Sequence, residues 1–191
     1  MDIVPTAIPD VKVLLPARHG DARGWLSETW RRDRFAAAGI DFDFVQDNTA
    51  FSAVAGTIRG LHFQTQPCTQ GKLVRAVMGS IFDVAVDLRR GSPTYGRHAA
   101  ATLSAERGET MWVPPGFAHG FCTLEPDCLV IYKMTALYSP THEKGLRWDD
   151  PALGIVWPVA NDAAILMAAD RAHPLLADLG AVFPATSIPG R

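Results

Sequence analysis

Two histidines and a lysine are the residues of this chain whose types and spacing first suggest chemistry. His62 is followed by Gln64, so the His-x-His pair that would offer a metal ion two imidazoles is absent. Zinc, iron and manganese need several neutral imidazoles or carboxylates, and the ammonium group of Lys72 at a ligand position would repel them. We therefore expect proton chemistry without a metal, with Lys72 as a fixed cation and His119 nearby.

The spacing of these residues resembles the two-part signature of cupin β-barrels. Residues 108–119, with Gly108, Pro114, Gly116 and His119, fit its second half. Residues 56–64 fit its first half, except that one histidine stands where metal-binding cupins carry two. Lys72 stands seven residues before Gly79, where such cupins usually offer a glutamate.

Length and composition favour a single globular domain with a sizeable core over residues 1–191. The chain has 48% hydrophobic and 20% charged residues, which is ordinary for such a domain. A formal net charge of −2 without a basic run argues against a nucleic-acid partner. No apolar stretch approaches the roughly 20 residues that span a bilayer, so we expect no membrane role. Three cysteines without CxxC spacing and no signal-peptide pattern predict a reduced, cytoplasmic protein.

The elements that must position these residues are mostly strands. Short β-branched and aromatic runs alternate with Gly/Pro turns, which predicts an all-β barrel or sandwich with a few short helices. In residues 80–88 one face is apolar and the other carries Asp83 and Asp87, either as functional carboxylates or as a charge ladder in solvent. Residues 30–39 and 161–169 are the candidate helices, and the tail from His173 is expected to pack loosely. The predicted strands are 11–15, 44–48, 56–63, 72–77, 80–88, 97–103, 109–113, 117–124 and 128–134.

Ordered sequence blocks identify a more specific resemblance. They include Arg59-Gly60-Leu61-His62-Phe63-Gln64, Gln70-Gly71-Lys72-Leu73-Val74, Pro114-Pro115-Gly116-Phe117-Ala118-His119-Gly120-Phe121 and Trp148-Asp149-Asp150-Pro151. Together with blocks at 21–24, 46–48, 83–89, 91–94 and 132–133, they resemble the dTDP-4-dehydrorhamnose 3,5-epimerase family from about residue 21 to 170, which leaves 171–191 as a tail. The resemblance implies a cupin-like jelly roll, no cofactor, a nucleotide-diphosphate-sugar substrate, and a homodimer formed partly by N-terminal strand exchange.

The same resemblance implies the catalytic roles. Epimerisation beside a ketone needs a base on one face, a stabiliser for the enolate oxygen, and an acid on the other face. By similarity His62 is the base, with Asp170 holding its tautomer, and Tyr132 is the acid. Lys72 is placed near the C4 oxygen of the sugar. Read alone, each could instead be structural: a core histidine, a buried strand tyrosine or a solvated lysine.

Further residues match positions that contact the nucleotide-sugar in the family. Arginines suit the diphosphate because guanidinium binds phosphate oxygens bidentately. Carboxylates can accept hydrogen bonds from base or sugar hydroxyls, and a flat tyrosine can lie against the base. His119 lies in the pocket by similarity, with a structural role as its rival, and Trp25 is open between base contact and core. The expected substrate-binding residues are Arg23, Glu28, Gln46, Asn48, Arg59, His119, Tyr138 and Glu143.

Three departures from the family pattern leave the substrate open. Ala169 precedes Asp170 where the family commonly has a substrate-contacting lysine, Phe51 is bulky where a small or polar residue is usual, and Leu26 replaces a frequent aromatic. The sequence therefore predicts inversion at C3 and C5 of a dTDP-4-dehydro-6-deoxyhexose, as in dTDP-L-rhamnose biosynthesis. C3-only or C5-only epimerisation of a related nucleotide-sugar, a non-catalytic nucleotide-sugar-binding cupin and a metal-dependent cupin enzyme are the alternatives.

Overall fold

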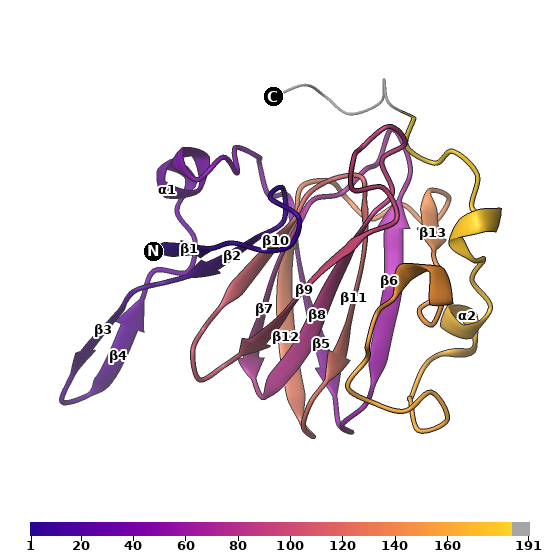
Figure 1. Ribbon diagram of the computed structural model, residues 1–191. Coiled ribbons are helices and arrows are strands. Elements are labelled where there is room, and N and C mark those ends of the chain that lie inside the picture. Colours follow the sequence, from indigo (N-terminus) through magenta and orange to yellow (C-terminus); the bar gives the residue numbers. More distant parts are fainter. Residues whose placement is uncertain (185–191) are drawn as a thin grey trace.

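In the computed structural model, which describes residues 1–184, two antiparallel sheets lie face to face (Figure 1). The first sheet has six strands in the order β1-β2-β10-β7-β12-β5, and the second has five in the order β13-β6-β11-β8-β9. The strands of the first sheet are β1 (Asp2–Val4), β2 (Lys12–Leu15), β10 (Thr110–Val113), β7 (Lys72–Met78), β12 (Cys128–Met134) and β5 (Gln46–Ser52). Those of the second sheet are β13 (Glu143–Gly145), β6 (Ile58–Gln64), β11 (Phe117–Thr123), β8 (Ser80–Asp87) and β9 (His98–Ser104).

The core between the sheets follows from the period-two alternation of the strands. Side chains that point inward from β7 and β12, such as Val74 and Val130, pack against Ile81 and Ala85 from β8. All nine predicted strands are present, with ends that differ by a few residues. The pattern did not reveal the strands β1, β3 (Arg18–Asp21), β4 (Gly24–Ser27) and β13, because three or four residues show little alternation. The fold is the all-β architecture that the sequence predicts.

Strand β8 corrects one interpretation. Asp83 and Asp87 do not form a ladder in solvent, because both are fully buried and point between the sheets with Ile81 and Ala85. The opposite face of β8, with Val84, is buried as well, under the C-terminal part of the chain. Buried carboxylates require partners. The polar alternation of this strand therefore marks an interior with specific polar contacts.

The chain after β13 covers the outer face of the five-stranded sheet. Trp148, Trp157 and Phe183 pack there against Val84 and neighbouring side chains. This segment contains two short 3-10 helices, η1 (Pro151–Leu153) and η2 (Leu176–Asp178), and the helix α2 (Ala168–Arg171). The prediction of a loosely packed tail was wrong for residues 173–184, where Phe183 is 1% exposed; residues 185–191 lie outside the described residues.

The two predicted helices had different outcomes. Helix α1 (Arg32–Ala37) forms within the predicted range 30–39 and buries Phe35 against the first sheet. The predicted helix at 161–169 was wrong. Those residues form a turn and an isolated bridge between Ile165 and Thr57, and helix α2 begins only at Ala168.

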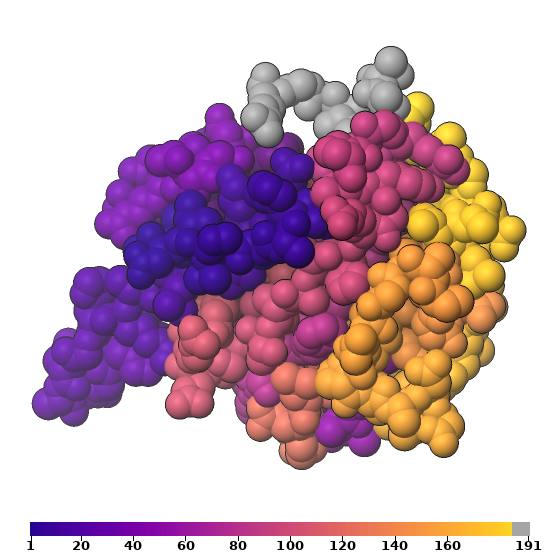
Figure 2. All heavy atoms as spheres, viewed as in Figure 1, coloured from indigo at the N-terminus to yellow at the C-terminus, as the bar shows by residue number. Residues whose placement is uncertain are grey.

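A two-stranded hairpin of β3 (Arg18–Asp21) and β4 (Gly24–Ser27) projects away from the sheets (Figures 1 and 2). Trp25 in this hairpin is 59% exposed and Leu26 is 75% exposed, so a core role for Trp25 was wrong. In residues 1–184 no helix has the length and apolar character needed to cross a membrane.

Candidate active site

A pocket of about 350 Å³ opens between the two sheets. Its walls are strands β5, β6, β7, β11 and β12, and the segment around α2 closes one side. Six residues singled out from the sequence meet in it: His62, Lys72, His119, Tyr132, Asp170 and Arg59.

His62 and Asp170 form the first of two histidine–aspartate pairs. The His62 Nε2 atom lies 2.7 Å from Asp170 Oδ1, and the Gly60 amide donates to Asp170 Oδ2 at 3.3 Å. His62 comes from β6, where it is 33% exposed at the side chain, and Asp170 comes from α2, where it is 6% exposed. The expected pairing of these two residues across more than a hundred positions is therefore present in the fold.

This geometry defines which atom of His62 can act as a base. An ionised carboxylate only accepts hydrogen bonds, so Nε2 carries the hydrogen and Nδ1 keeps the lone pair. Burial opposes ionisation of Asp170, but the hydrogen bond from His62 and its charge outweigh burial, and the pKa of Asp170 is lowered. Asp170 is thus an anion that orients His62 and stabilises the imidazolium formed when Nδ1 accepts a proton.

His119 and Asp83 form the second pair, deeper in the pocket. The His119 Nε2 atom lies 2.8 Å from Asp83 Oδ1, and the two side chains are 6% and 0% exposed. His119 stands directly opposite His62 in the register of β11 and β6. Burial lowers the pKa of His119 despite the opposing charge of Asp83. His119 is therefore a neutral hydrogen-bonding group at neutral pH.

Lys72 enters the pocket from β7, on the wall opposite His62. Burial lowers its pKa to about 8, and the charges of Asp83 and Glu143 limit this drop. Asp83 Oδ2 is a buried oxygen without a hydrogen-bond partner in residues 1–184. Lys72 therefore remains a cation at neutral pH, and the Asp83 carboxylate supports its charge.

Tyr132 lies on β12, in the same sheet as Lys72 and opposite His62. Its hydroxyl accepts a hydrogen bond from Asn48 Nδ2 at 3.3 Å, and Asn48 Oδ1 accepts from Gln46 Nε2 at 2.9 Å. Gln46 Oε1 in turn accepts from the Tyr138 amide at 2.8 Å. The Tyr138 hydroxyl donates to Glu143 at 2.6 Å, and this bond raises the pKa of Tyr138. A polar chain thus links Tyr132 to the exposed rim.

Several residues named from the sequence are absent from the lining of this pocket, and Gln46, Asn48, Tyr138 and Glu143 are among them. Arg23 and Glu28 are exposed on or just after the projecting hairpin. Phe51 points outward from the six-stranded sheet and is 51% exposed, while its neighbour Ala50 lines the pocket. Ala169 is exposed and outside the pocket lining. Within one chain, none of these residues lines the pocket.

The sequence did not reveal two further parts of the site. An apolar wall is formed by Ile165, Leu166 and Met167, which the sequence assigned to a helix. His173 also approaches the pair, with Nε2 at 3.6 Å from Asp170 Oδ1. The only signal for His173 was its place three residues after Asp170.

The described residues also contain one group with the donor atoms of a metal site. His62, Asp170 and His173 offer ligand atoms within 4.8 Å of one another. The proton in the 2.7 Å bond between His62 and Asp170 would have to leave before an ion could bind there. The arrangement as it stands is that of a hydrogen-bonded acid–base pair.

Comparison with known proteins gives the family. The family profile described as dTDP-4-dehydrorhamnose 3,5-epimerase matches residues 5–178. A dTDP-4-dehydrorhamnose 3,5-epimerase from Sinorhizobium fredii is 50% identical over 177 residues, which are 93% of this chain and 90% of the relative.

Solved structures agree in fold. A dTDP-6-deoxy-D-glucose-3,5-epimerase from Legionella pneumophila, in complex with dTDP-4-keto-L-rhamnose, superposes with a TM-score of 0.90 at 41% identity, covering 96% of this chain and 97% of that one. A 3′-monoepimerase from Streptomyces bikiniensis with dTDP-quinovose gives 0.85 at 35% identity, covering 94% and 91%. With these matches over most of its length, and with a cupin-like jelly roll as its fold, the chain belongs to the dTDP-4-dehydrorhamnose 3,5-epimerase family.

Proposed function

We propose that this protein inverts C3 and C5 of a dTDP-4-dehydro-6-deoxyhexose, in a deoxysugar route such as dTDP-L-rhamnose synthesis. The observation that carries the proposal is the placement of His62 and Tyr132 on opposite walls of one pocket. A base on one face of a sugar ring and an acid on the other can remove a proton and return it with inversion. The acid–base set is intact, which disfavours a purely binding role.

Each residue has one role in this mechanism. His62 Nδ1 removes the proton from the carbon beside the C4 ketone, and Asp170 stabilises the resulting imidazolium. The charge that moves onto the C4 oxygen meets the ammonium of Lys72, in a buried environment where such interactions are strong. His119 donates to the Asp83 carboxylate that supports this ammonium. Tyr132 then donates its phenolic proton to the opposite face. No metal or cofactor takes part in these steps.

Incubation of the enzyme with dTDP-4-dehydro-6-deoxyglucose in deuterated water tests the proposal. Two inversions should leave deuterium at both C3 and C5 of the product. The variant Tyr132→Phe should still exchange protons on the His62 face but fail to complete inversion. Absence of any exchange in the wild-type protein would contradict the assignment of an epimerase.

Inversion at one carbon is the second candidate. This chain is 35% identical to a 3′-monoepimerase, with a TM-score of 0.85. That similarity is the reason to test for inversion at a single carbon. One base and one acid serve both carbons only when the sugar can turn within the pocket, so the shape of the Ile165–Met167 wall matters. Deuterium at C3 alone, or at C5 alone, would replace the double-epimerase assignment.

Nucleotide binding is assigned to the outer part of the pocket. Arg59 lines the pocket, and its guanidinium donates to Ser52 Oγ at 3.2 Å and to the Phe51 carbonyl at 2.8 Å. We propose that Arg59 holds the diphosphate and that Gln46, Asn48, Tyr138 and Glu143 contact the nucleotide or sugar. The half-exposed ring of Tyr138 offers a flat face at the rim.

A homodimer could place Arg23 and Glu28 at a pocket, which they do not reach within one chain. The projecting hairpin exposes Trp25 and Leu26, and the neighbouring strand β1 is an edge strand with Ile3 and Val4 also exposed. Such apolar surface and a free strand edge favour pairing with a second copy. We propose that the hairpin exchanges between subunits and carries Arg23 and Glu28 to the pocket of the partner.

Subunit mixing provides the test. A His62→Asn variant lacks the base in its own pocket, and an Arg23→Ala variant lacks the arginine that it would supply to its partner. Mixed and re-equilibrated, the two should regain activity, since every heterodimer holds one pocket with both groups. Light scattering gives the oligomeric state, and a monomer would contradict the exchange.

A cytoplasmic location completes the proposal. All three cysteines, Cys68, Cys122 and Cys128, are free thiols. Free thiols are typical of a reducing compartment. Fractionation of cells that produce the protein would test this location.

A further inference from the structure

His173 lies beside the His62–Asp170 pair, in a slot that exists because residue 145 is a glycine. Gly145 stands directly opposite His62 in the register of β13 and β6. A Cβ atom on Gly145 would overlap the imidazole ring of His173. The backbone of Gly145 lies outside the positive-φ residues of the chain, so its conformation does not itself demand glycine. The lack of a side chain at Gly145 therefore leaves the space that the imidazole ring of His173 occupies.

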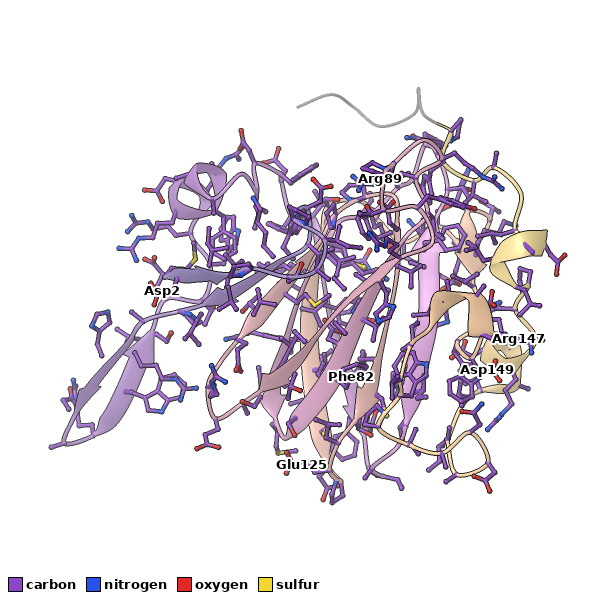
Figure 3. All side chains as sticks on the ribbon, viewed as in Figure 1. Asp2, Phe82, Arg89, Glu125, Arg147 and Asp149 are labelled. Carbon is purple, nitrogen blue, oxygen red and sulfur yellow. The ribbon has the colours of Figure 1, made fainter. Side chains whose placement is uncertain are left out.

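The backbone on either side fixes His173 in this slot. Arg147 Nε donates to the His173 carbonyl at 3.0 Å, and the Arg147 amide donates to the Pro174 carbonyl at 2.8 Å. Figure 3 shows Arg147 beside the C-terminal segment with α2. These contacts tie the chain after α2 to the strand that pairs with β6, so His173 cannot move far from Asp170.

The ring of His173 faces the same carboxylate oxygen that His62 uses. Its Nε2 atom is 3.6 Å from Asp170 Oδ1, and the two rings meet edge to face with centroids 5.7 Å apart. This Nε2 atom is buried and has no hydrogen-bond partner in residues 1–184. A hydrogen bond needs a slightly shorter distance. Catalytic hydrogen bonds are often long in free enzymes and tighten when substrate binds.

We propose that His173 is a positioning residue, a second donor to Asp170 that limits how strongly this carboxylate holds the proton on His62. The proposal rests on the proposed function, in which His62 is the base. A donor on Asp170 Oδ1 shares the carboxylate charge, so less of it stabilises the His62 imidazolium. His62 then gives up its proton more readily after each abstraction.

The charges around the slot are consistent with a neutral donor. Burial lowers the pKa of His173, and the positive charge of His62 adds to this effect. Asp170 from α2 and Glu143 from β13 act in the opposite direction without reversing it. The guanidinium of Arg147 binds the backbone carbonyl of His173, and His119 faces His62 from β11.

The test measures the titration of His62 by NMR in the resting protein, which needs no substrate. In His173→Phe, which keeps an aromatic ring but lacks the donor, the pKa of His62 should rise by about 0.4 to 1 unit, the equivalent of one neutral hydrogen bond. His173→Gln keeps an N–H donor and should stay near the wild-type value. Gly145→Ala, which displaces the ring, should behave like His173→Phe.

The same variants should shift the acid limb of kcat/KM to higher pH with little change in KM, because His62 must be neutral to act. The His98 resonance is the internal control, since His98 bonds to the Leu153 carbonyl outside the pocket. An unchanged His62 titration in a folded His173→Phe or Gly145→Ala protein would overturn the proposal. A shifted titration in a protein without epimerase activity would keep the coupling and contradict only the proposed function.

Discussion

The two histidine–aspartate pairs of this pocket have nearly the same geometry and different surroundings. His62 and Asp170 are 2.7 Å apart, and His119 and Asp83 are 2.8 Å apart. The His62 side chain is 33% exposed, whereas that of His119 is 6% exposed. A base must reach the substrate and exchange its proton, whereas the buried imidazole of His119, whose pKa is lowered, donates its one N–H to Asp83 and stays fixed there. The greater solvent exposure of His62 therefore suits it to act as the base, and the burial of His119 suits it to hold Asp83 in place.

The largest effect should come from replacing the accessible histidine. His62→Asn removes the proposed base and should lower kcat by about 10²- to 10⁴-fold or more. Its melting temperature should change little, because the side chain is partly exposed. Steady-state kinetics and thermal unfolding measure both quantities, and a near wild-type rate would remove His62 from the mechanism.

The same substitution at the buried histidine should lower stability more and kcat less than His62→Asn does. His119→Asn leaves the Asp83 carboxylate without its partner, and an unsatisfied buried polar group costs about 1–3 kcal/mol of stability. The melting temperature should therefore fall more than in His62→Asn, and kcat should fall less. If both variants lose rate and stability equally, the distinction between the pairs fails.

An intermediate effect is expected at the carboxylate of the accessible pair. Asp170→Asn keeps the shape of the side chain but removes a charged hydrogen bond worth about 1.5–3 kcal/mol. This corresponds to a loss of about 10- to 100-fold in kcat. The acid limb of the pH–rate profile should also move to lower pH, because the imidazolium of His62 loses its counter-charge. An unmoved limb would contradict the role of Asp170.

A smaller effect on kcat, which depends on pH, is expected from Lys72. Asp83 of the buried pair stabilises the charge of this lysine. The Lys72 pKa of about 8 lies between neutral pH and the usual lysine value. The ammonium is present below this pKa and is lost above it, so kcat should fall as pH rises through about 8. Lys72→Arg should remove this basic limb, because guanidinium stays charged. Asp83→Asn should move the limb to lower pH by withdrawing the anion that supports the lysine charge.

The smallest effect should come from metal removal. Because a proton bridges His62 and Asp170, extensive dialysis against a chelator should leave kcat unchanged. Metal analysis of the dialysed protein provides the control. A reversible loss of activity, restored by one divalent metal, would turn the His62, Asp170 and His173 group into a metal site.

The strands and the pocket residues could be predicted from the sequence to different degrees. Alternation in β8 predicts a strand, but it could not tell whether Asp83 faces water or the interior, because a polar face is compatible with both. The family blocks predict His62, Lys72, Tyr132 and Asp170 together, and the fold brings these four residues into one pocket. His173 was missed because its place depends on the missing side chain of Gly145, a contact between distant segments that no local pattern carries.

The position of Asp170 on the C-terminal segment ties activity to the packing of that segment. His62, the proposed base, lies on β6, and Asp170 is held by a segment that packs through Trp148, Trp157 and Phe183 on the outer face of the five-stranded sheet. Until this segment docks, His62 has no anion to orient it. Any loss of this packing, by substitution or by proteolysis, should therefore separate Asp170 from His62 and lower activity.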